Sequence, residues 1–300
     1  MDVEEPPLSP TAKLYCSVIV PVFEHWERIP ALLQRLQGQT LEQERFEVLL
    51  VDNGSKHFSP PEKLPGNVRI LRCPKPGSYA ARNYGIAHAA GEWLVFTDAD
   101  CLPRAQWLEC LLRERDAAAG EPIVLAGAVE MVGLSPNPTP YEVYDLVKGI
   151  PQKRYVARGY AATANLAVPK EIAKRLQGFD ETRFSGGDAD FCRRAVAAGI
   201  LLQYVPEAVV EHPPRTSWEE LAQKARRVKG GQLTAGPRRR QHLWWARTFM
   251  PPVRAVGRFL GVRHVPLRYR LVAIWVQLGI WATEMREAVR LLGSAPAERR

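Results

Sequence analysis

The chain has 300 residues, of which 46% are hydrophobic and 24% charged. These values are ordinary for a globular protein and exclude disordered, collagen-like and disulfide-scaffold classes. The five cysteines are odd in number and form no C-x-x-C pair, which argues against a structural zinc site or a disulfide framework and indicates a reducing compartment. The acidic, proline-rich residues 1–7 do not have the pattern of a signal peptide.

The net charge of +9 is unevenly distributed along the chain. Residues 1–213 contain 23 Lys and Arg against 27 Asp and Glu, whereas residues 214–300 contain 18 against 5. A slightly acidic body and a basic C-terminal part, with net charges of −4 and +13, indicate that the C-terminal part faces an anionic partner. Phospholipid, nucleic acid and a diphosphate ligand are the candidates.

Strands and helices alternate in the first hundred residues, after a flexible lead-in expected at residues 1–13. Short apolar, β-branched runs predict strands, at residues 16–20, 46–51, 68–71 and 93–97. Helical patterns lie between them, at residues 29–36 and 77–90. This alternation predicts an α/β fold with a mostly parallel sheet that is covered by helices on both faces.

The remaining chain contains fewer clear patterns. Helices are predicted beyond Pro103 to about Ala119 and at 187–199, and strands at 123–132 and 201–205. Residues 133–160, rich in Pro, Gly and Tyr, show no clear period and are expected to form a loop. From Trp218 the pattern becomes helical and basic. We therefore expect a catalytic or binding domain over 14–217 and a basic, amphipathic helical extension over 218–300.

Carboxylates follow two of the predicted strands. Asp52 comes directly after the second, and Asp98 and Asp100 come after the fourth. In an open parallel sheet, ligands bind beyond the carboxyl ends of the strands. Paired carboxylates there suit a hard divalent cation such as Mg²⁺ or Mn²⁺. The structural alternative is that Asp100 caps the helix expected near Pro103.

Three further polar side chains allow either a functional or a structural interpretation. Arg82, near the start of the helix that Gly77 opens, can hydrogen-bond a nucleobase or ribose, or it is simply solvated. Asp188 lies at the entry to a predicted helix, where the helix dipole favours a carboxylate for structural reasons alone. His212 follows an apolar run and is either a ligand or a structural histidine.

Six short motifs, taken in order, resemble those of family 2 glycosyltransferases. The resemblance covers residues 16–214, about two thirds of the chain, and implies the GT-A fold and a nucleoside-diphosphate sugar as donor. The motifs are Pro21-Val22-Phe23-Glu24, Val51-Asp52-Asn53-Gly54-Ser55, Arg82-Asn83-x-Gly85, Phe96-Thr97-Asp98-Ala99-Asp100, Gly178-Phe179-Asp180-Glu181 and Gly187-Asp188-Ala189-Asp190.

The resemblance implies a role for each matching residue on the nucleotide side. Pro21, Phe23 and Glu24 would line the nucleotide pocket after the first strand. Asp52 would contact the base or ribose, with Arg82 close by. On this interpretation the loops after the first two strands hold the nucleoside.

The resemblance also implies a metal site and a base. Asp98 and Asp100 match the D-x-D pair that holds a divalent cation, Mg²⁺ or Mn²⁺, against the donor diphosphate. His212 matches a histidine that reaches this cation in many GT-A enzymes. Asp188 matches the general base that takes the proton of the acceptor hydroxyl during inversion.

The acceptor side departs from the family pattern. Residues 163–165 resemble the strip that faces donor sugar and acceptor, but Gly187 stands where many members have Glu. Because of this substitution, the alternative that the chain is a catalytically inactive module that only binds a sugar nucleotide stays open. A sugar nucleotidyltransferase would carry a Gly-rich loop after the first strand, and Val20-Pro21-Val22-Phe23-Glu24 stands there instead. No Q-x-x-R-W signature is present, so we expect a single-addition enzyme.

The basic extension suggests where such an enzyme acts. Leu271–Thr283 is a run of 13 residues without a charge, shorter than the ~20 that a membrane span needs. It either lies in a membrane interface or belongs to a C-terminal helix pair that packs on the catalytic domain, with Trp275, Leu278 and Trp281 as core. Nucleic acid is not expected as a partner, because no recognition module is present. We expect a cytoplasmic enzyme, peripheral at the inner face of the cell membrane, that glycosylates a hydroxyl acceptor of a cell-envelope glycan, lipid-linked or polysaccharide precursor.

Overall fold

The computed structural model describes residues 14–118, 120–133, 135–183, 185–234, 238–263 and 265–293. The expected lead-in at 1–13 and residues 294–300 of the expected extension lie outside the described residues. The chain divides into two compact units. The first contains the described residues up to Ala128, Gln152–Phe179 and Ala189–Val210. The second contains Val129–Pro151, Asp180–Asp188 and the described residues from Glu211 onward.

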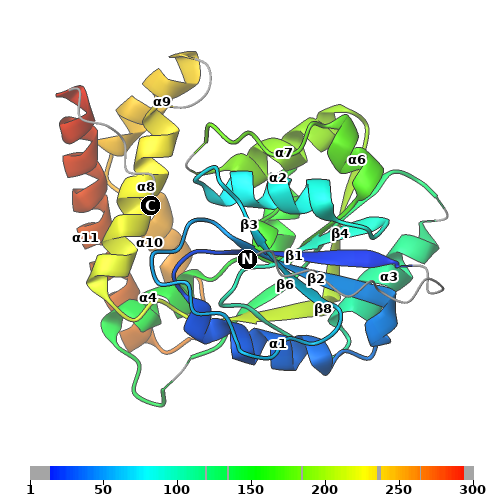
Figure 1. The fold of residues 1–300 in the computed structure, drawn as a ribbon. Helices are drawn as coiled ribbons and strands as arrows, with labels where there is room; N and C mark the ends of the chain where they lie inside the picture. Colours follow the sequence, from blue (N-terminus) through cyan, green and yellow to red (C-terminus); the bar gives the residue numbers. More distant parts are fainter. Residues whose placement is uncertain are drawn as a thin grey trace. The chain divides into compact units, whose positions relative to one another are not determined.

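The first unit is built on an eight-stranded sheet with the order β3-β2-β1-β4-β7-β6-β8-β5 (Figure 1). All six strands that the sequence predicts are present. The last residues of β6 and β8 belong to the second unit. The strands are β1 (Cys16–Val22), β2 (Phe46–Asp52), β3 (Val68–Arg72), β4 (Trp93–Phe96), β5 (Leu102–Pro103), β6 (Ile123–Met131), β7 (Leu166–Pro169) and β8 (Leu201–His212).

The parallel half of the sheet sets the geometry of the site. β1 pairs in parallel with β2, so that Val22 lies opposite Asp52, and with β4, so that Ile19 lies opposite Phe96. The carboxyl ends of β1, β2 and β4 therefore lie at one edge of the sheet. β7, which the sequence does not predict, runs antiparallel to both β4 and β6.

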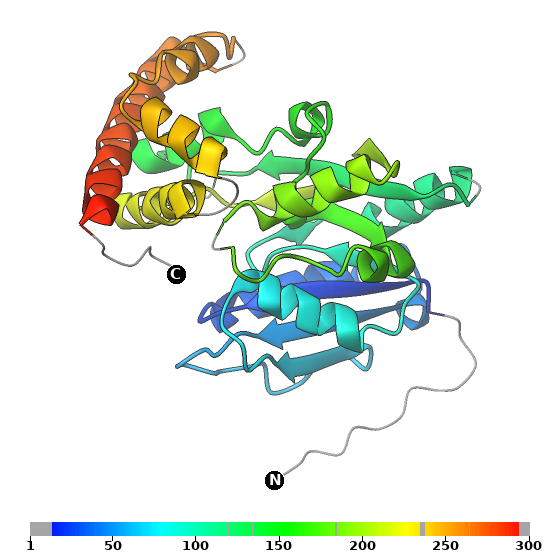
Figure 2. The ribbon, with the colours of Figure 1, turned by 90° about the horizontal axis from the view of Figure 1, so that it is seen from above.

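Helices cover both faces of this sheet, as predicted. In Figure 1, α1 lies below the sheet, and α2, α6 and α7 lie above it. Figure 2 looks down from above and shows α2, in cyan, over the blue strands of the parallel half. The helices of this part of the chain are α1 (Ile29–Gln37), α2 (Ser78–His88), α3 (Trp107–Ala117), α6 (Lys170–Arg175) and α7 (Gly187–Ala197).

The core of the first unit joins α2 and α7 to β4. Phe179 stacks on Tyr79 and packs edge-on against Phe96. Its ring also contacts Phe191 of α7, at 4.7 Å between centroids. Gly85 lets α2 approach the sheet, because a Cβ at this position would lie 2.5 Å from the Ile19 side chain.

One expectation about the middle of the chain is confirmed and another is wrong. The helix expected beyond Pro103 is present as α3, which begins at Trp107 after Leu102 and Pro103 form β5. Residues 133–160 are not a loop but contain α4 (Pro140–Lys148) and α5 (Gln152–Val156). α4 begins with a capping box between Thr139 and Glu142 and with Pro140 in its first turn. Nine residues are too few for a visible period, and packing on distant helices stabilises this one.

The second unit is a helical assembly in which α11 packs along α4 and α8. The helical pattern predicted from Trp218 is confirmed by α8 (Trp218–Thr234), α9 (Arg238–Thr248), α10 (Val253–Leu260) and α11 (Leu267–Leu292). Its apolar core is formed by Val143, Tyr144, Val147, Leu221, Ala225, Phe259, Ala273, Val276 and Ile280.

Two of the three residues expected as core of the C-terminal helix pair lie at the surface instead. Trp275 and Leu278 are exposed, and the buried residues of α11 lie on the opposite side, at Ala273, Val276 and Ile280. Leu278 lies two residues from both Val276 and Ile280, and a step of two residues turns a side chain to the other side of a helix. Within the described part of the chain, no helix combines the length and apolar character that crossing a bilayer requires.

Candidate functional site

The loops after β1 and β2 begin at the same edge of the sheet. Pro21 lies within β1 and Phe23 directly follows it, and both are half-buried. Asp52 ends β2 with 4% of its surface exposed. Its carboxylate accepts hydrogen bonds from the backbone N–H groups of Gly54 and Ser55, each at 3.3 Å. Asp52 therefore shapes the turn that follows its own strand.

Hydrogen bonds through Glu24 and Ser55 cross-link these two loops. The Glu24 N–H donates to Ser55 Oγ at 2.8 Å. The Glu24 carboxylate accepts from the N–H groups of Lys56 and His57 at 2.7 and 3.2 Å. These donors, Lys56 first, lower the pKa of Glu24. Glu24 has a φ of 65°, a left-handed conformation that non-glycine residues rarely adopt and that often occurs at functional sites.

Arg82 is directed at the first carboxylate of the D-x-D pair. Its Nη2 donates to Asp98 Oδ1 at 2.6 Å, and its Nη1 donates to the Ser78 carbonyl at 3.4 Å. The guanidinium also lies 5.8 Å from the centre of the Tyr79 ring. Only 5% of Arg82 is exposed, so the interpretation of Arg82 as a solvated side chain is wrong.

The second carboxylate belongs to the same loop. Asp100 accepts a hydrogen bond from Arg28 Nη1 at 3.3 Å. It does not cap α3, because that helix begins at Trp107. Asp98, Asp100 and Cys101 each offer one potential metal-ligand atom, and these atoms lie within 4.8 Å of one another. Burial and then the charges of the two carboxylates raise the pKa of Cys101, so its thiol is protonated in the absence of a cation.

Two amide side chains, one in the Arg82-Asn83 motif and one in the strip 163–165, are held within the protein. Asn83 Nδ2 donates to the Phe179 carbonyl at 2.8 Å, and the Phe179 N–H donates back to Asn83 Oδ1 at 2.8 Å. Asn165 Nδ2 donates to the carbonyls of Ala128 and Ala208, each at 2.8 Å. Asn165 is completely buried, so it does not face a sugar as the resemblance implied. Both asparagines fix the backbone.

His212 lies in the second unit, as the last residue of β8. It is buried, and its Nδ1 lies 2.7 Å from the Pro213 carbonyl oxygen. Because a carbonyl oxygen can only accept, Nδ1 carries a proton, and in the neutral ring the lone pair is on Nε2. Metal-binding histidines use this arrangement, which fixes both the tautomer and the ring orientation.

Asp188 also lies in the second unit and is the second residue of α7. It is half-buried. Its segment, Asp180–Asp188, packs on α8, where a Cβ at Gly231 would lie 3.3 Å from Ser185. The structure thus brings seven of the nine predicted site residues together in the first unit and assigns Asp188 and His212 to the second.

Sequence patterns did not identify all polar residues near these positions. Arg28 lies 72 positions before Asp100, and no local pattern marks the pair. Ser55, in contrast, is part of the D-N-G-S turn, and its position after Asp52 could have indicated a loop contact.

A cluster of charged side chains around the buried Asp145 of the second unit was also missed. Asp145 Oδ2 accepts hydrogen bonds from the N–H and Nη1 of Arg215, at 3.2 and 2.9 Å. Burial opposes ionisation of Asp145, but Lys224 and Arg215 outweigh it and lower its pKa. Burial, followed by repulsion from Arg215 and Lys148, lowers the pKa of Lys224 to about 7.

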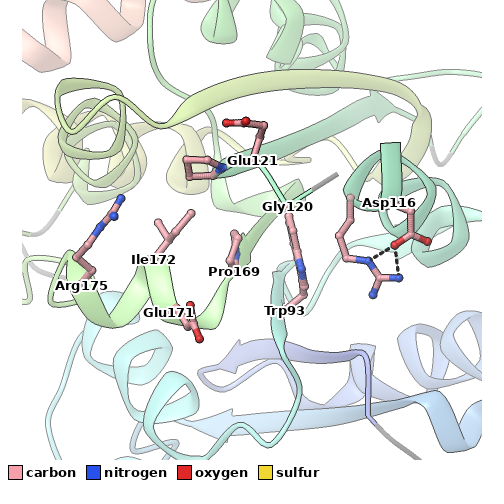
Figure 3. Close-up of a pocket in the computed structure, with 10 residues that line it drawn as sticks. Trp93, Asp116, Gly120, Glu121, Pro169, Glu171, Ile172 and Arg175 are labelled. Atoms are coloured by element: carbon pink, nitrogen blue, oxygen red, sulfur yellow. Dashed lines mark hydrogen bonds and ion pairs between the residues drawn. The ribbon is translucent and has the colours of Figure 1, made fainter. Parts of the chain in front are cut away.

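A pocket of about 550 Å³ lies at the opposite edge of the sheet (Figure 3). Trp93, the first residue of β4, and Pro169, the last residue of β7, line it. Its charged lining mixes both signs, and Arg115 pairs there with Asp116 at 2.6 Å. Because Asp98 follows the other end of β4, this pocket is separate from the candidate site.

Comparisons with known proteins agree with this fold and with these motifs. The model of "Glycosyl transferase family 2" matches residues 17–134, and that of "Glycosyl transferase family group 2" matches residues 147–283. Glycosyltransferase AglE of Haloferax volcanii is 34% identical over 229 residues, which are 73% of each chain. The pre-mycofactocin glycosyltransferase of Mycobacterium tuberculosis is 29% identical over 233 residues, 73% of this chain but only 47% of that protein.

The solved structures include a protein with a similar fold. The mannosyltransferase PcManGT of Pyrobaculum calidifontis, in complex with GDP-Man and Mn²⁺, superposes with a TM-score of 0.59 at 17% identity. The superposition covers 95% of this chain and 89% of that one. The sheet topology, together with this likeness and the family match, defines a protein with the GT-A fold.

The chain belongs to glycosyl transferase family 2 and is a glycosyltransferase.

Proposed function

We propose that this enzyme transfers a sugar, with inversion and with the help of a divalent cation, from a nucleoside diphosphate to a hydroxyl acceptor. The observation that carries the proposal is the position of Asp52, Asp98 and Asp100. Asp52 ends β2, and the other two carboxylates follow β4, at the edge of a parallel sheet where ligands bind.

The nucleoside would lie between the loops after β1 and β2. Pro21, Phe23 and Glu24 come from the first loop and strand end, and Asp52 comes from the second. The hydrogen bonds of Glu24 and Ser55 already join the two loops, so little ordering remains to be done on binding. Arg82 supports the site from beneath by holding Asp98.

Asp98, Asp100 and His212 would hold the cation. Two carboxylates and a neutral imidazole are a donor set that Mn²⁺ accepts, and Mg²⁺ accepts the carboxylates. His212 is a potential ligand by its chemistry, and its Nδ1–H bond leaves the lone pair on Nε2. The proposed place of His212 in this set rests on the family resemblance. A bound cation would neutralise charge on the leaving diphosphate.

Asp188 would act as the general base. Its place in the first turn of α7 favours the ionised carboxylate, which is the form that accepts a proton. The acceptor oxygen forms a bond to the anomeric carbon while its proton moves to Asp188. The bond between that carbon and the diphosphate oxygen breaks, and its electron pair leaves with the nucleoside diphosphate.

The acceptor would be a hydroxyl of a lipid-linked or polysaccharide precursor of the cell envelope. The net charge of +13 on residues 214–300 supports an enzyme that works at an anionic membrane surface, on its cytoplasmic side. The second unit, which contains these residues, would make that contact.

The proposal is tested by release of nucleoside diphosphate from UDP-, GDP- and dTDP-sugars with Mn²⁺, Mg²⁺ or EDTA. We expect one donor to be used, loss of release in EDTA, and loss in Asp100→Ala and in Asp188→Asn. Glu62→Gln, which removes an exposed carboxylate from the first unit, is the matched control and keeps full release.

The same panel tests the alternative of an inactive binding module. Donor binding by calorimetry without any release, and with equal affinity in Asp188→Asn, would replace the proposed transferase with a sensor. Release that persists undiminished in EDTA would contradict the metal-dependent mechanism.

A further inference from the structure

The exposed face of α11 is apolar along the whole helix. Between 44% and 67% of the surface of each of its large exposed side chains is accessible. Their spacing of three, four or eleven positions places them on one side of the helix. These residues are Leu267, Leu271, Trp275, Leu278, Val289 and Leu292.

The opposite side of α11 is already occupied. Ala273, Val276 and Ile280 are buried in the core of the second unit, against α4 and α8. In Figure 1, α11 runs beside α8 within this unit. Because folding of the unit uses only one side of the helix, the apolar face is available for another surface. A helix of 26 residues is about 39 Å long, so this face is extended.

Arginines border the apolar face. Arg268 and Arg286 are exposed and lie 18 residues apart, which is five helical turns, so both point to the same edge. Arg270 is held in a different way, because it donates to the carbonyls of Leu260, Arg263 and Val265 and so fixes the turn that enters the helix.

α10 repeats this combination on a smaller scale. Phe259 anchors it in the core of the second unit, whereas Val253 and Leu260, seven residues apart, are exposed. Arg254 and Arg258 are exposed on the same helix. Two neighbouring helices of the unit thus present large apolar side chains next to arginines.

We infer that α10 and α11 bind the surface of an anionic lipid bilayer, with the apolar face of α11 inserted among the headgroups and its axis along the membrane plane. Helices with one apolar face, arginine borders and a tryptophan bind in this way. The inference deepens the proposed function, on which it rests for the class of acceptor, by naming the residues that make the membrane contact.

The charge of the unit favours lipid over a second copy of the chain. Residues 214–300 carry a net charge of +13, and a second copy would bring the same charge to the face. Arg268 and Arg286 would then approach arginines at a desolvated border, which is unfavourable. Anionic headgroups instead neutralise these side chains.

Vesicle co-sedimentation of the full chain tests the inference. We expect binding to phosphatidylcholine vesicles that contain phosphatidylglycerol, and much weaker binding to phosphatidylcholine alone or in about 0.5 M salt. Leu271→Gln combined with Leu278→Gln should weaken binding by at least about tenfold. Leu201→Gln, at an equally exposed leucine of the first unit, is the control and should leave binding unchanged.

Three results would overturn the inference. The first is no binding to anionic vesicles, and the second is equal binding by the double variant and the wild-type chain. The third is a dimer in sedimentation velocity that the double variant dissociates, which would show that a second copy covers the face. Because vesicle binding needs neither donor nor acceptor, its failure beside normal nucleotide release would leave the proposed transferase intact.

Discussion

Arg82 and Asp98 form an ion pair at 2.6 Å that connects α2 to the loop after β4. Arg82 is 5% exposed, whereas 35% of the Asp98 side chain is accessible. The guanidinium therefore lies beneath the carboxylate and leaves its outer side open to solvent. In this way one end of the D-x-D pair is oriented from within the protein.

The ion pair should contribute to stability as well as to binding. We expect Arg82→Gln to lower the free energy of unfolding by about 1.5–3 kcal/mol, because a charged hydrogen bond is lost at a buried position. A double-mutant cycle with Asp98→Asn, measured by urea unfolding, should give a coupling of about 1 kcal/mol or more. Strict additivity would show that the two side chains do not stabilise each other.

Asn83 should be required for folding and not for chemistry. Asn83→Ala leaves both backbone groups of Phe179 without their hydrogen bonds, and we expect a loss of about 2–4 kcal/mol in urea unfolding. His88→Ala, at the exposed end of the same helix, should cost much less. Equal losses in the two variants would contradict this role of Asn83.

Lys224 should make stability depend on pH. Its pKa is about 7 in the folded protein and 10.5 ordinarily. Below pH 7 the ammonium is charged in both the folded and the unfolded state, so the full cost of burying it is present. As pH rises from 7 toward 10.5, the folded state has released a proton that the unfolded state keeps, and stability rises.

Lys224→Met removes this dependence. We expect the variant to exceed the wild type in stability below pH 7 and to lose this advantage as the pH approaches about 10. The lost attraction to Asp145 reduces the gain but does not reverse its trend with pH. Urea unfolding across this range is the measurement, and Lys153→Met, at an exposed lysine, is the control. A gain independent of pH would be contrary to expectation.

Gly231 should control the position of Asp188. A Cβ there would lie 3.3 Å from the Ser185 backbone nitrogen, so Gly231→Val must displace the segment that leads to Asp188. We expect kcat for nucleotide release to fall by about ten- to a hundredfold, while donor binding by the first unit changes little. Gly257→Ala, where no atom lies within 4 Å of the new Cβ, is the control. An unchanged kcat in Gly231→Val would show that the position of the segment Asp180–Asp188 does not affect catalysis.

The parallel half of the fold could be predicted because its signals are local. Strands such as β1 and β2 are buried on both faces and therefore consist mainly of apolar residues, and β2 leads into a D-N-G turn. α4 could not be predicted in the same way. It has nine residues, and its buried side pairs with α11, more than a hundred positions later.

The residues of the candidate site also fall into those that local sequence signals indicate and those that only the structure brings together. The sequence alone identified Asp52, Asp98 and Asp100, because a carboxylate directly after an apolar run stands at the end of a strand. It did not assign Arg28 to Asp100 or Arg82 to Asp98, because the distance between two side chains depends on how strands and helices far apart in sequence pack.

The C-terminal helix shows the same division most clearly. The sequence by itself determined that Leu271–Thr283 is apolar and bordered by charge. Only the tertiary structure decided that Ala273, Val276 and Ile280 face the core and that Trp275 and Leu278 face outward. Because the run Leu271–Thr283 has no charged residue, several of its sides could be buried. The helices that pack against it, α4 and α8, decide which side is.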